Sequence, residues 1–470
     1  MVAELIAEES YGEESLRAQY LISSETGQLK KERLYENSGF TSINKFIKDA
    51  FLPQGYPKSV SSDYLEYQIW DTCQAFCSSI VAALAAQAML KAYGVGDEKA
   101  TVLAATFTWL LKDGAGMVGR IVFTWLKGTE LDCHAKKWRL AADVINDLTY
   151  CIELLAPRFR DYLLLFACMS SICRSLVGVC GGATRAALTQ HQARRDNMAD
   201  VSAKDGSQET MVNLLAFLVN LVLVPLVTGR ERIIWLLFLV FTTLHLYCNF
   251  RAVSSVVMET VNSSRMRLLV DHFINDGLVL SPQEISAIEP ILTKCHKSLD
   301  VNLGCPLSNV ISSSNDFFAA LPNSKEIHYI MKLEISKNFK SGCVNVALHR
   351  NIDSESLLQC YFQIAIMDLV IRSPRLRTKG ATEDEMSELA LNNLCHLWQQ
   401  IYNARELPAR ASWDVVAYAH NFTLKVFPAF LKGLESRGWE TSRNHLGPDE
   451  WRADWNLSRP GYEISRNKQL

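Results

Sequence analysis

The sequence predicts a mainly α-helical fold, in which a polytopic helical membrane domain is followed by a small soluble α+β domain. Two neighbouring runs without any charged residue, Met211–Val227 and Ile233–Phe250, predict the membrane domain. The surrounding stretch 160–250 is rich in Leu, Val and Phe, whereas residues 290–470 have the composition of an ordinary soluble protein. This change in composition separates a membrane part from a soluble C-terminal domain.

The composition of the whole chain argues against a polyanion partner and does not indicate an enzyme. The formal net charge of the 470 residues is −2, without the basic bias that attracts nucleic acid. The 13 cysteines are scattered without a Cys-x-x-Cys pair, and no His/Cys spacing fits a zinc site, so no metal site is expected. The sequence has no phosphate-binding loop, dinucleotide fingerprint or hydrolase elbow, so it predicts neither a catalytic residue nor a cofactor.

Residues 1–50 are polar and weakly patterned, which predicts a variable and partly disordered leader. Residues 1–16 hold several glutamates and no basic residue, so neither a signal peptide nor a transit peptide is expected. The membrane domain, predicted over residues 51–275, would then insert through internal segments.

The first helical pattern covers Tyr67–Tyr93 and contains few charges. Ala75, Ser79 and Ala83 recur every fourth residue and form a stripe of small side chains, where a second helix can approach closely. The stripe suits a pair of membrane helices and a pair of soluble helices equally well.

Two shorter apolar segments follow, Ala100–Leu111 and Ala115–Leu126, with Lys112, Asp113 and Gly114 between them. Each segment is too short to span a bilayer by itself. The pattern predicts either a helix broken at membrane depth, as in transporters, or two soluble helices joined by a turn.

Towards residue 250 the apolar segments contain fewer charged residues. Tyr162–Cys180 is apolar apart from Arg174, and the two uncharged runs predict a transmembrane hairpin over residues 211–250, with a buried pair of core helices as the alternative. Arginine and lysine are more numerous on both outer flanks than in the joint. The positive-inside tendency therefore places the flanks, and with them the C-terminal domain, in the cytosol. The organelle and the number of further spanning helices stay open.

Four polar residues inside the hairpin form two pairs at helical spacing, Asn213 with Asn220 and His245 with Asn249. Separations of seven and four residues place the members of each pair on one helix face. Polar groups at membrane depth face the interior of a bundle, where they either hold helices together or line a path for a solute.

The densest group of charged residues lies within residues 181–210, between two membrane candidates. Arginine side chains can supply paired donors to an anion, and two adjacent glycines allow a ligand to approach the backbone. The candidate anion or cofactor site comprises Arg120, Arg185, His191, Arg194, Arg195, Asp200, Lys204 and Asp205. The alternative is a solvated cytosolic loop whose charges only set the topology. A second group of the same character consists of Arg139, Asp143, Asn146 and Asp147.

A weak internal sequence similarity relates two parts of the predicted membrane domain. Gly116 and Arg120 precede an Ala-Asp-Val triplet at residue 142, and Gly181 and Arg185 precede the same triplet at residue 199. A true repeat would indicate two related halves, as in secondary transporters, but the intervening lengths differ enough for chance to produce the same pattern.

The C-terminal region alternates strand and helix patterns. Residues Ile327–Ile335 and Cys343–His349 predict two strands. Helices are predicted over residues 354–371, 383–403 and 415–436, with short extended pieces at 439–445 and 451–455. Nothing in this region marks it as catalytic.

Four blocks of residues carry a resemblance to a known family. They are FLPQGYPKSV at 51–60 followed by Asp63-Tyr64, KDGAGMVGR at 112–120, WRLAAD at 138–143, and GGATRAAL at 181–188 followed by NMADVSAKD at 197–205. Together they resemble the root UV-B sensitive family. The resemblance is nearest to the animal member of that family and covers about residues 50–455.

The resemblance implies a role in small-molecule homeostasis but no chemistry. Plant members are associated with seedling responses to ultraviolet B, with pyridoxal-vitamin homeostasis and with auxin transport, and some act as a pair in plastids. The first hypothesis is therefore a transporter-like protein or scaffold in a lipid bilayer. The second is a membrane-anchored adaptor whose C-terminal domain binds a protein partner or a paralogue. The third is a pyridoxal-phosphate-handling protein that uses the cluster between Arg185 and Asp205.

Overall fold

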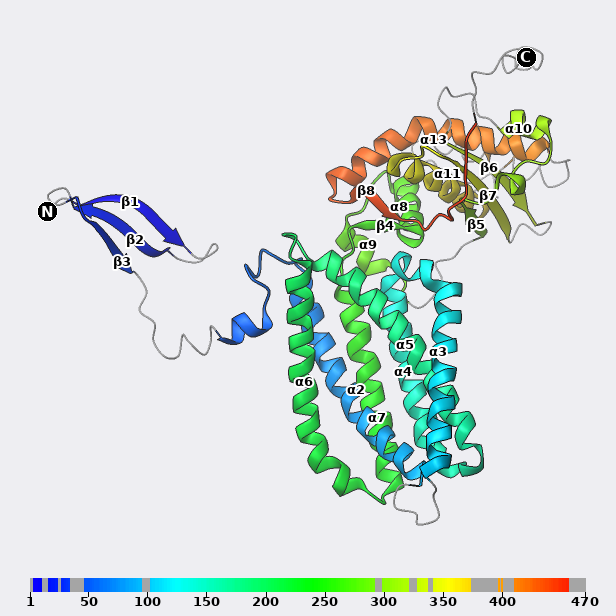
Figure 1. Cartoon of the computed structure of the whole chain (residues 1–470). Coiled ribbons are helices and arrows are strands. Elements are labelled where there is room, and N and C mark those ends of the chain that lie inside the picture. Colours follow the sequence, from blue (N-terminus) through cyan, green and yellow to red (C-terminus); the bar gives the residue numbers. More distant parts are fainter. Residues whose placement is uncertain are drawn as a thin grey trace. The chain divides into compact units, whose positions relative to one another are not determined.

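The computed structural model describes most of the chain, and Figure 1 shows its elements. The described residues are 3–10, 16–23, 27–33, 46–94, 102–291, 298–320, 328–336, 341–372, 396–397, 399 and 410–455. The chain forms two compact units, which we call the helical unit and the C-terminal unit. The helical unit comprises Met1–Leu126 and Trp138–Val256, and the C-terminal unit comprises Lys127–Lys137 and Val257–Leu470.

The N-terminal residues form an antiparallel sheet with strand order β1-β2-β3. The strands are β1 (Ala3–Ser10), β2 (Leu16–Ser23) and β3 (Leu29–Arg33). These strands lie within the segment for which the sequence predicts a variable and partly disordered leader. Apolar and polar residues alternate from Leu16 to Tyr20, and Lys31 Nζ lies 2.7 Å from Glu9 Oε2 and 2.8 Å from the Tyr20 hydroxyl. Such pairs between strands stabilise a sheet whose sequence is largely polar.

Long helices make up the rest of the helical unit. They are α2 (Tyr64–Ala92), α3 (Val102–Cys133), α4 (Ala135–Leu155), α5 (Leu163–Gln192), α6 (Met198–Val227) and α7 (Glu231–Ser255), with the 3₁₀ turns η1 (Ala156–Arg158) and η2 (Arg160–Tyr162) between α4 and α5. The last residues of α3 and the first residues of α4 belong to the C-terminal unit.

Four described helical segments are long and apolar enough to cross a membrane. They are Tyr64–Ala92, Arg160–Gln192, Met198–Val227 and Glu231–Ser255. Large apolar side chains on these helices point outward, and Leu221, Val222 and Leu236 are each more than half exposed. Soluble proteins seldom expose apolar surface on this scale, so the fold is compatible with the predicted insertion into a membrane.

Helix α2 packs against both α6 and α7. Lys91 Nζ near the end of α2 lies 3.8 Å from Glu231 Oε1, and Glu66 Oε1 near its start lies 3.8 Å from Arg251 Nη2, so α2 and α7 run antiparallel. Helices α6 and α7 are consecutive, as the predicted hairpin over 211–250 requires, but they diverge from their turn and α2 lies between them (Figure 1). The hairpin is therefore part of a three-helix arrangement.

Helix α3 is continuous through Lys112, Asp113 and Gly114. Both predictions for this region, a broken membrane helix and two helices joined by a turn, are therefore wrong. A single glycine weakens a helix by only about 1 kcal/mol, which packing against a neighbour can offset. Gly116 and Gly119 provide that packing, because both lie in close contact with α5.

Gly116→Ala is expected to destabilise the helical unit by about 1–3 kcal/mol. A Cβ at this position would lie 2.5 Å from Ser171 Oγ and 3.3 Å from the Ser171 carbonyl oxygen, so α3 and α5 would have to separate. Thermal unfolding of the detergent-solubilised chain measures the loss. Gly114→Ala is the matched control on the same helix, because nothing lies within 4 Å of its Cβ, and equal effects of the two changes would contradict the close packing.

The C-terminal unit contains helices and strands of an α+β fold. Its elements are β4 (Thr260–Asn262), α8 (Ser263–Asp276), α9 (Pro282–Ile288), β5 (Leu299–Leu303), η3 (Leu307–Asn309), α10 (Ser314–Ala320), β6 (Tyr329–Ile335), β7 (Gly342–His349), α11 (Ser354–Arg372), α13 (Arg410–Ser436), β8 (Glu440–His445) and β9 (Arg452–Ala453). These bounds agree closely with the strands predicted near 327–335 and 343–349 and with the helix predicted over 354–371. The helix predicted over 383–403 lies almost wholly outside the described residues.

Strand β7 is central to the main sheet of this unit. It pairs antiparallel with β6 and parallel with β5 and β9, while β4 and β8 form a separate parallel pair. Helices α8, α11 and α13 contribute to the core, in which Phe362 and Phe430 are fully buried with their ring centroids 4.6 Å apart. The side chains of α11 are buried nearly all round, as expected for a helix enclosed by other elements.

A buried ion cluster ties residue 136 to the rest of the C-terminal unit. Lys136 Nζ and Arg265 Nε lie 3.4 Å and 3.1 Å from the carboxylate of Glu289, and Lys136 also donates to Ser286 Oγ at 2.9 Å. Burial by itself would raise the pKa of Glu289, but the two cations outweigh it and lower that pKa below its ordinary value.

Candidate functional site

Buried polar residues gather between α2, α4 and α7. We call them the central polar cluster: Tyr67, Asp71 and Gln74 of α2, Arg139, Asp143 and Asp147 of α4, and His245 and Asn249 of α7. On each helix these residues are three or four positions apart, so the helical period places them on one face. The sequences of α2 and α7 are otherwise largely apolar, which leaves their polar faces inside the bundle against α4.

His245 lies in the middle of the central polar cluster and is fully buried. Its Nδ1 is 2.9 Å and 3.0 Å from the two carboxylate oxygens of Asp147. Its Nε2 is 2.9 Å from the amide nitrogen of Gln74 and 3.7 Å from Oδ2 of Asp143. With the Gln74 amide in this orientation its nitrogen donates to Nε2, which corresponds to a neutral ring whose Nδ1 proton is donated to Asp147.

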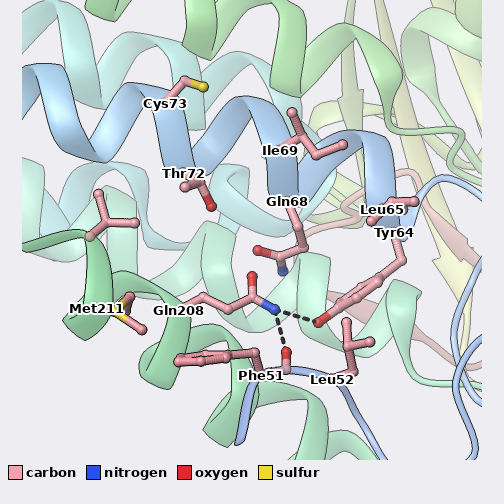
Figure 2. A pocket seen from close by; sticks show the side chains of 11 residues that line it. Phe51, Leu52, Tyr64, Leu65, Gln68, Ile69, Thr72, Cys73, Gln208 and Met211 are labelled. Carbon is pink, nitrogen blue, oxygen red and sulfur yellow. Dashed lines mark hydrogen bonds between the residues drawn. The ribbon is translucent and has the colours of Figure 1, made fainter. Parts of the chain in front are cut away.

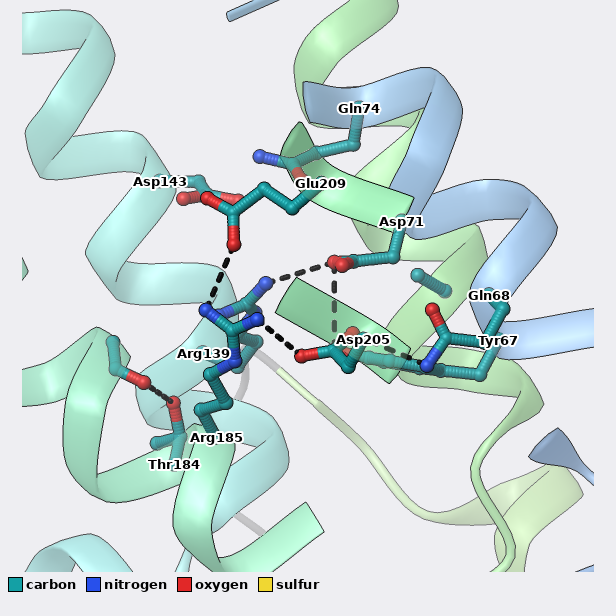
Figure 3. A network of polar contacts seen from close by, with 12 residues as sticks. Tyr67, Gln68, Asp71, Gln74, Arg139, Asp143, Thr184, Arg185, Asp205 and Glu209 are labelled. Carbon is teal, nitrogen blue, oxygen red and sulfur yellow. Dashed lines mark hydrogen bonds and ion pairs between the residues drawn. The ribbon is translucent and has the colours of Figure 1, made fainter. Parts of the chain in front are cut away.

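An ion pair lies one helical turn away. Arg139 Nη2 donates to Asp71 Oδ1 at 2.8 Å, and the Tyr67 hydroxyl donates to the same oxygen at 3.4 Å (Figure 3). The side chains of Arg139 and Asp71 are 16% and 17% exposed, so water screens the pair only weakly. Removal of either side chain would therefore leave the other as a largely buried charge without its counter-charge.

Several polar atoms of this cluster are buried without a hydrogen-bond partner among the described residues. They are both amide atoms of Asn249, Oδ2 of Asp143 and Nε of Arg139. Because α4 runs parallel to α2 and antiparallel to α7, Asn249 lies one turn beyond His245, at the level of Asp143. A buried polar group without a partner costs about 1–3 kcal/mol, so this level of the bundle is suited to a polar molecule more than to packing alone.

A second group, the outer polar cluster, joins α2, α5 and α6. Arg185 lies 2.5 Å from Asp205 Oδ2 and 2.8 Å from Glu209 Oε2, and Gln68 Nε2 donates to Asp205 Oδ1 at 3.2 Å (Figure 3). Arg185 and Glu209 are partly exposed, and Asp205 interacts electrostatically with Asp71 of the central polar cluster. The outer polar cluster therefore lies near the surface, and the central polar cluster lies deeper between the helices.

A pocket of about 470 Å³ opens beside the outer polar cluster (Figure 2). Helices α2 and α6 and the residues before α2 form its walls, with the aromatic rings of Phe51 and Tyr64 and the amides of Gln68 and Gln208 among them. Gln208 donates to the Phe51 carbonyl at 2.5 Å and to the Tyr64 hydroxyl at 3.3 Å. The volume and the mostly apolar lining with a few polar groups are typical of a small-molecule pocket.

The other predicted anion-site residues hold the segment before α2. His191 Nε2 lies 2.9 Å from Asp63 Oδ2, both side chains being buried. Asp200 Oδ2 accepts from the backbone N–H of Gln54 at 2.7 Å, and Lys204 donates to the backbone carbonyl of residue 49. These contacts fix the chain that leads into α2.

Arg194, Arg195 and Arg120 complete the predicted set. The backbone N–H of Arg194 donates to the backbone carbonyl oxygen of Ser59 at 3.1 Å, and the guanidinium of Arg195 lies beside Gly55. Arg120 is exposed on α3, and within the described ranges no contact joins it to the other seven residues. The eight residues therefore do not form one site, and only Arg185 and Asp205 come together.

The four polar residues predicted at membrane depth have two different surroundings. Ser79 Oγ donates to Asn213 at 2.6 Å, and Asn220 Nδ2 donates to the Ser79 carbonyl at 3.1 Å, so both asparagines hold α6 against the small-residue stripe of α2. His245 and Asn249 belong instead to the central polar cluster. The sequence analysis did not single out Tyr67, Gln68, Asp71, Gln74 or Glu209. The spacing of Tyr67, Asp71 and Gln74 on one face of an apolar helix was the available signal.

Two family models match the chain in succession. Residues 38–277 match a vitamin B6 photo-protection and homoeostasis domain, and residues 278–455 match the C-terminal domain of root UVB sensitive protein. The chain belongs to the root UVB sensitive family. Protein root UVB sensitive 3 of Arabidopsis thaliana is 35% identical over 425 residues, which cover 88% of each chain. RUS family member 1 of Dictyostelium discoideum is 50% identical over 283 residues, which cover 59% of this chain and 53% of that protein.

The root UVB sensitive family predicted from the four sequence blocks is thereby confirmed. No solved structure matches the chain significantly. The boundary between the two family domains coincides with the end of α8, where Gly277 adopts a left-handed conformation. Both polar clusters and the pocket lie within the vitamin B6 photo-protection and homoeostasis domain.

Proposed function

We propose that the helical unit is a membrane transporter-like domain that passes an unphosphorylated vitamin B6 compound, such as pyridoxal, across a lipid bilayer without chemical change. The central polar cluster carries the proposal, because Asp71 and His245 lie on two of the helices that are long and apolar enough to cross a membrane and pair with Arg139 and Asp147 of α4. Ionised side chains at membrane depth cost free energy and are typical of solute and proton paths. The description of the matched domain supports the choice of a vitamin B6 compound as the solute.

The charge of the two clusters favours a solute without a phosphate group. In the outer polar cluster one arginine faces the carboxylates of Asp205 and Glu209. In the central polar cluster Arg139 is the one cation beside three aspartates when His245 is neutral. Among the described residues, both clusters therefore hold more acidic than basic side chains, and when these are ionised they repel a phosphate ester such as pyridoxal 5′-phosphate. This argument weighs against the third hypothesis from the sequence.

The pocket supplies groups suited to a substituted pyridine. Phe51 and Tyr64 offer ring faces and edges for aromatic contact, and Gln68 and Gln208 offer donors and acceptors for hydroxyl groups and the ring nitrogen. Gln68 also contacts Asp205, so a solute that leaves the pocket meets the outer polar cluster next.

Proteoliposomes that contain the full chain are expected to take up radiolabelled pyridoxal, and Gln68→Ala is expected to reduce the rate about tenfold, equivalent to about 1.4 kcal/mol. Gln87→Ala is the matched control on the same helix, because Gln87 also bonds to α6, through Thr228 Oγ1 at 2.6 Å, but away from the pocket. We expect its rate to stay within about twofold of the wild type, and we expect pyridoxal 5′-phosphate to be a poor solute. Uptake no faster than in protein-free liposomes would refute the proposal.

The C-terminal unit favours a second candidate function, a membrane-anchored adaptor. It has its own hydrophobic core and its own family domain, and β6 is an outer strand of the main sheet among the described strands. An outer strand can bind a segment of a protein partner, or of a second family member, by strand addition. This function predicts no pyridoxal uptake for the wild type or for any variant, so the same experiment distinguishes the two.

A further inference from the structure

The surroundings of His245 offer partners for two protonation states of its ring. In the neutral ring the proton on Nδ1 is donated to Asp147, and Nε2 accepts from the amide of Gln74. A second proton on Nε2 would need an acceptor there. Asp143 Oδ2 lies 3.7 Å away and has no hydrogen-bond partner among the described residues.

A small movement of Asp143 or of the Gln74 amide would supply a hydrogen-bond acceptor for the second N–H group of a doubly protonated His245 ring. A charge-assisted hydrogen bond is about 2.7–2.9 Å long, so Asp143 needs to approach by roughly 1 Å. Rotation of the Gln74 amide by half a turn would present its oxygen to Nε2 in place of its nitrogen. A histidine that serves only packing needs partners for one state, whereas His245 has Asp143 and the Gln74 amide oxygen within reach for a second one.

We propose that His245 binds and releases a proton during passage of the solute, with Asp143 as the acceptor that stabilises its charged form. The inference deepens the proposed function and rests on it. The step is one proton transfer: an N–H bond forms at Nε2 when a proton arrives from water, and the same bond breaks when the proton leaves.

The charged and titratable groups around His245 favour this exchange. From α4 it faces Asp143, Asp147 and Arg139, and from α2 it faces the uncharged amide of Gln74. Asp71 of α2 pairs with Arg139, and Cys77 of α2 interacts electrostatically with Asp147 and with Cys248 of α7. With its three carboxylates and one guanidinium ionised, the central polar cluster has a formal net negative charge. A proton on His245 reduces this excess, so a solute that carries positive charge and a proton would compete for the same cluster.

A chain of polar residues connects His245 with the surface. Glu209 is 49% exposed at the outer polar cluster, whereas His245 is completely buried. Asp205, Asp71 and Asp143 lie between them, each interacting electrostatically with the next. These carboxylates place acidic groups at successive depths between the surface and His245, where a path for protons is expected.

Nuclear magnetic resonance of the full chain, labelled with ¹⁵N-histidine in lipid nanodiscs, tests the proton site without any transport assay. We expect one fully buried ring that is in the Nδ1–H form at high pH and becomes doubly protonated between pH 5 and 9. His245→Gln should remove this signal, and His272→Gln, which changes an exposed ring, should not. Asp143→Asn should move the titration by about one pH unit or more to lower pH.

The control for Asp143→Asn is Glu66→Gln, which removes an exposed carboxylate of α2 outside the central polar cluster. A buried ring that does not titrate, or that titrates identically in Asp143→Asn, would overturn the inference. The tautomer and the titration of the wild-type chain need no variant to fold, so they decide the question even if His245→Gln does not fold.

Measurements of pyridoxal uptake distinguish the proton inference from the proposed transport function. We expect a pH difference of one unit across the liposome membrane to change the rate of pyridoxal uptake at least threefold, and His245→Gln to remove this response. If pyridoxal enters regardless of the pH difference, the proton inference falls and the proposed function stands. If no pyridoxal enters while His245 titrates as expected, the proposed function falls and the proton site stands.

Discussion

Glu289→Ala is expected to destabilise the C-terminal unit by about 3–5 kcal/mol, because it leaves two buried cations without their counter-charge. Arg265 and Lys136 lie 3.1 Å and 3.4 Å from this carboxylate, and none of the three side chains is more than 7% exposed. Hydrogen exchange of peptides from β5 to β7 measures the loss in the full chain. Glu435→Ala on the exposed face of α13 is the control, with an expected change within about 0.5 kcal/mol. Equal losses in the two variants would contradict the role of the ion cluster.

The same carboxylate gives the unit a defined sensitivity to acid. Burial alone would raise the pKa of Glu289, but Arg265 and Lys136 lower it below its ordinary value of 4.5. A carboxylate whose pKa is lower in the folded state stabilises the fold at pH values above its unfolded pKa and loses this contribution as the pH falls through its folded pKa. The wild type should therefore lose stability below about pH 4.5, and Glu289→Gln should show a flatter profile over the same range.

The sequence predicts those elements of the fold whose signals are local. The uncharged runs place the C-terminal part of α6 and most of α7, and alternation places β6 and β7, because each pattern is complete within one element. The N-terminal sheet was not predicted because it depends on pairs such as Glu9 with Lys31, which lie on different strands. The continuity of α3 also depends on a distant element, since its glycines pack against α5. The position of α2 between α6 and α7 has no local signal.

The candidate site was likewise predictable from the sequence only where its signal lies within one helix. The helical spacing of Arg139, Asp143 and Asp147 and of His245 and Asn249 is visible in the sequence, and it places each set on one helix face. Which faces meet is not visible, because His245 and Asp147 are 98 residues apart. The eight residues of the predicted anion site were grouped by their closeness in the sequence. Arg185 and His191 both lie on α5, but their spacing puts them on different faces of the helix, so they have different partners.

Arg139→Gln is expected to reduce the stability of the helical unit by about 3–5 kcal/mol and to reduce pyridoxal uptake more than tenfold. The change leaves Asp71 as a largely buried carboxylate between α2 and α4, without the donor that now lies 2.8 Å away. Thermal unfolding in detergent measures the stability, and uptake is normalised to the amount of folded protein. Lys91→Gln is the control, because its exposed ion pair with Glu231 should contribute less than about 1 kcal/mol.

The double variant Arg139→Gln/Asp71→Asn separates the structural and functional roles of this ion pair. Removing both charges leaves no buried carboxylate without a counter-charge, so most of the lost stability should return. If the pair serves the passage of the solute, uptake should stay at least tenfold below the wild type even though the fold is restored. If stability and uptake both return, the ion pair only holds α2 against α4, and the solute path must depend on the other charged residues of the central polar cluster.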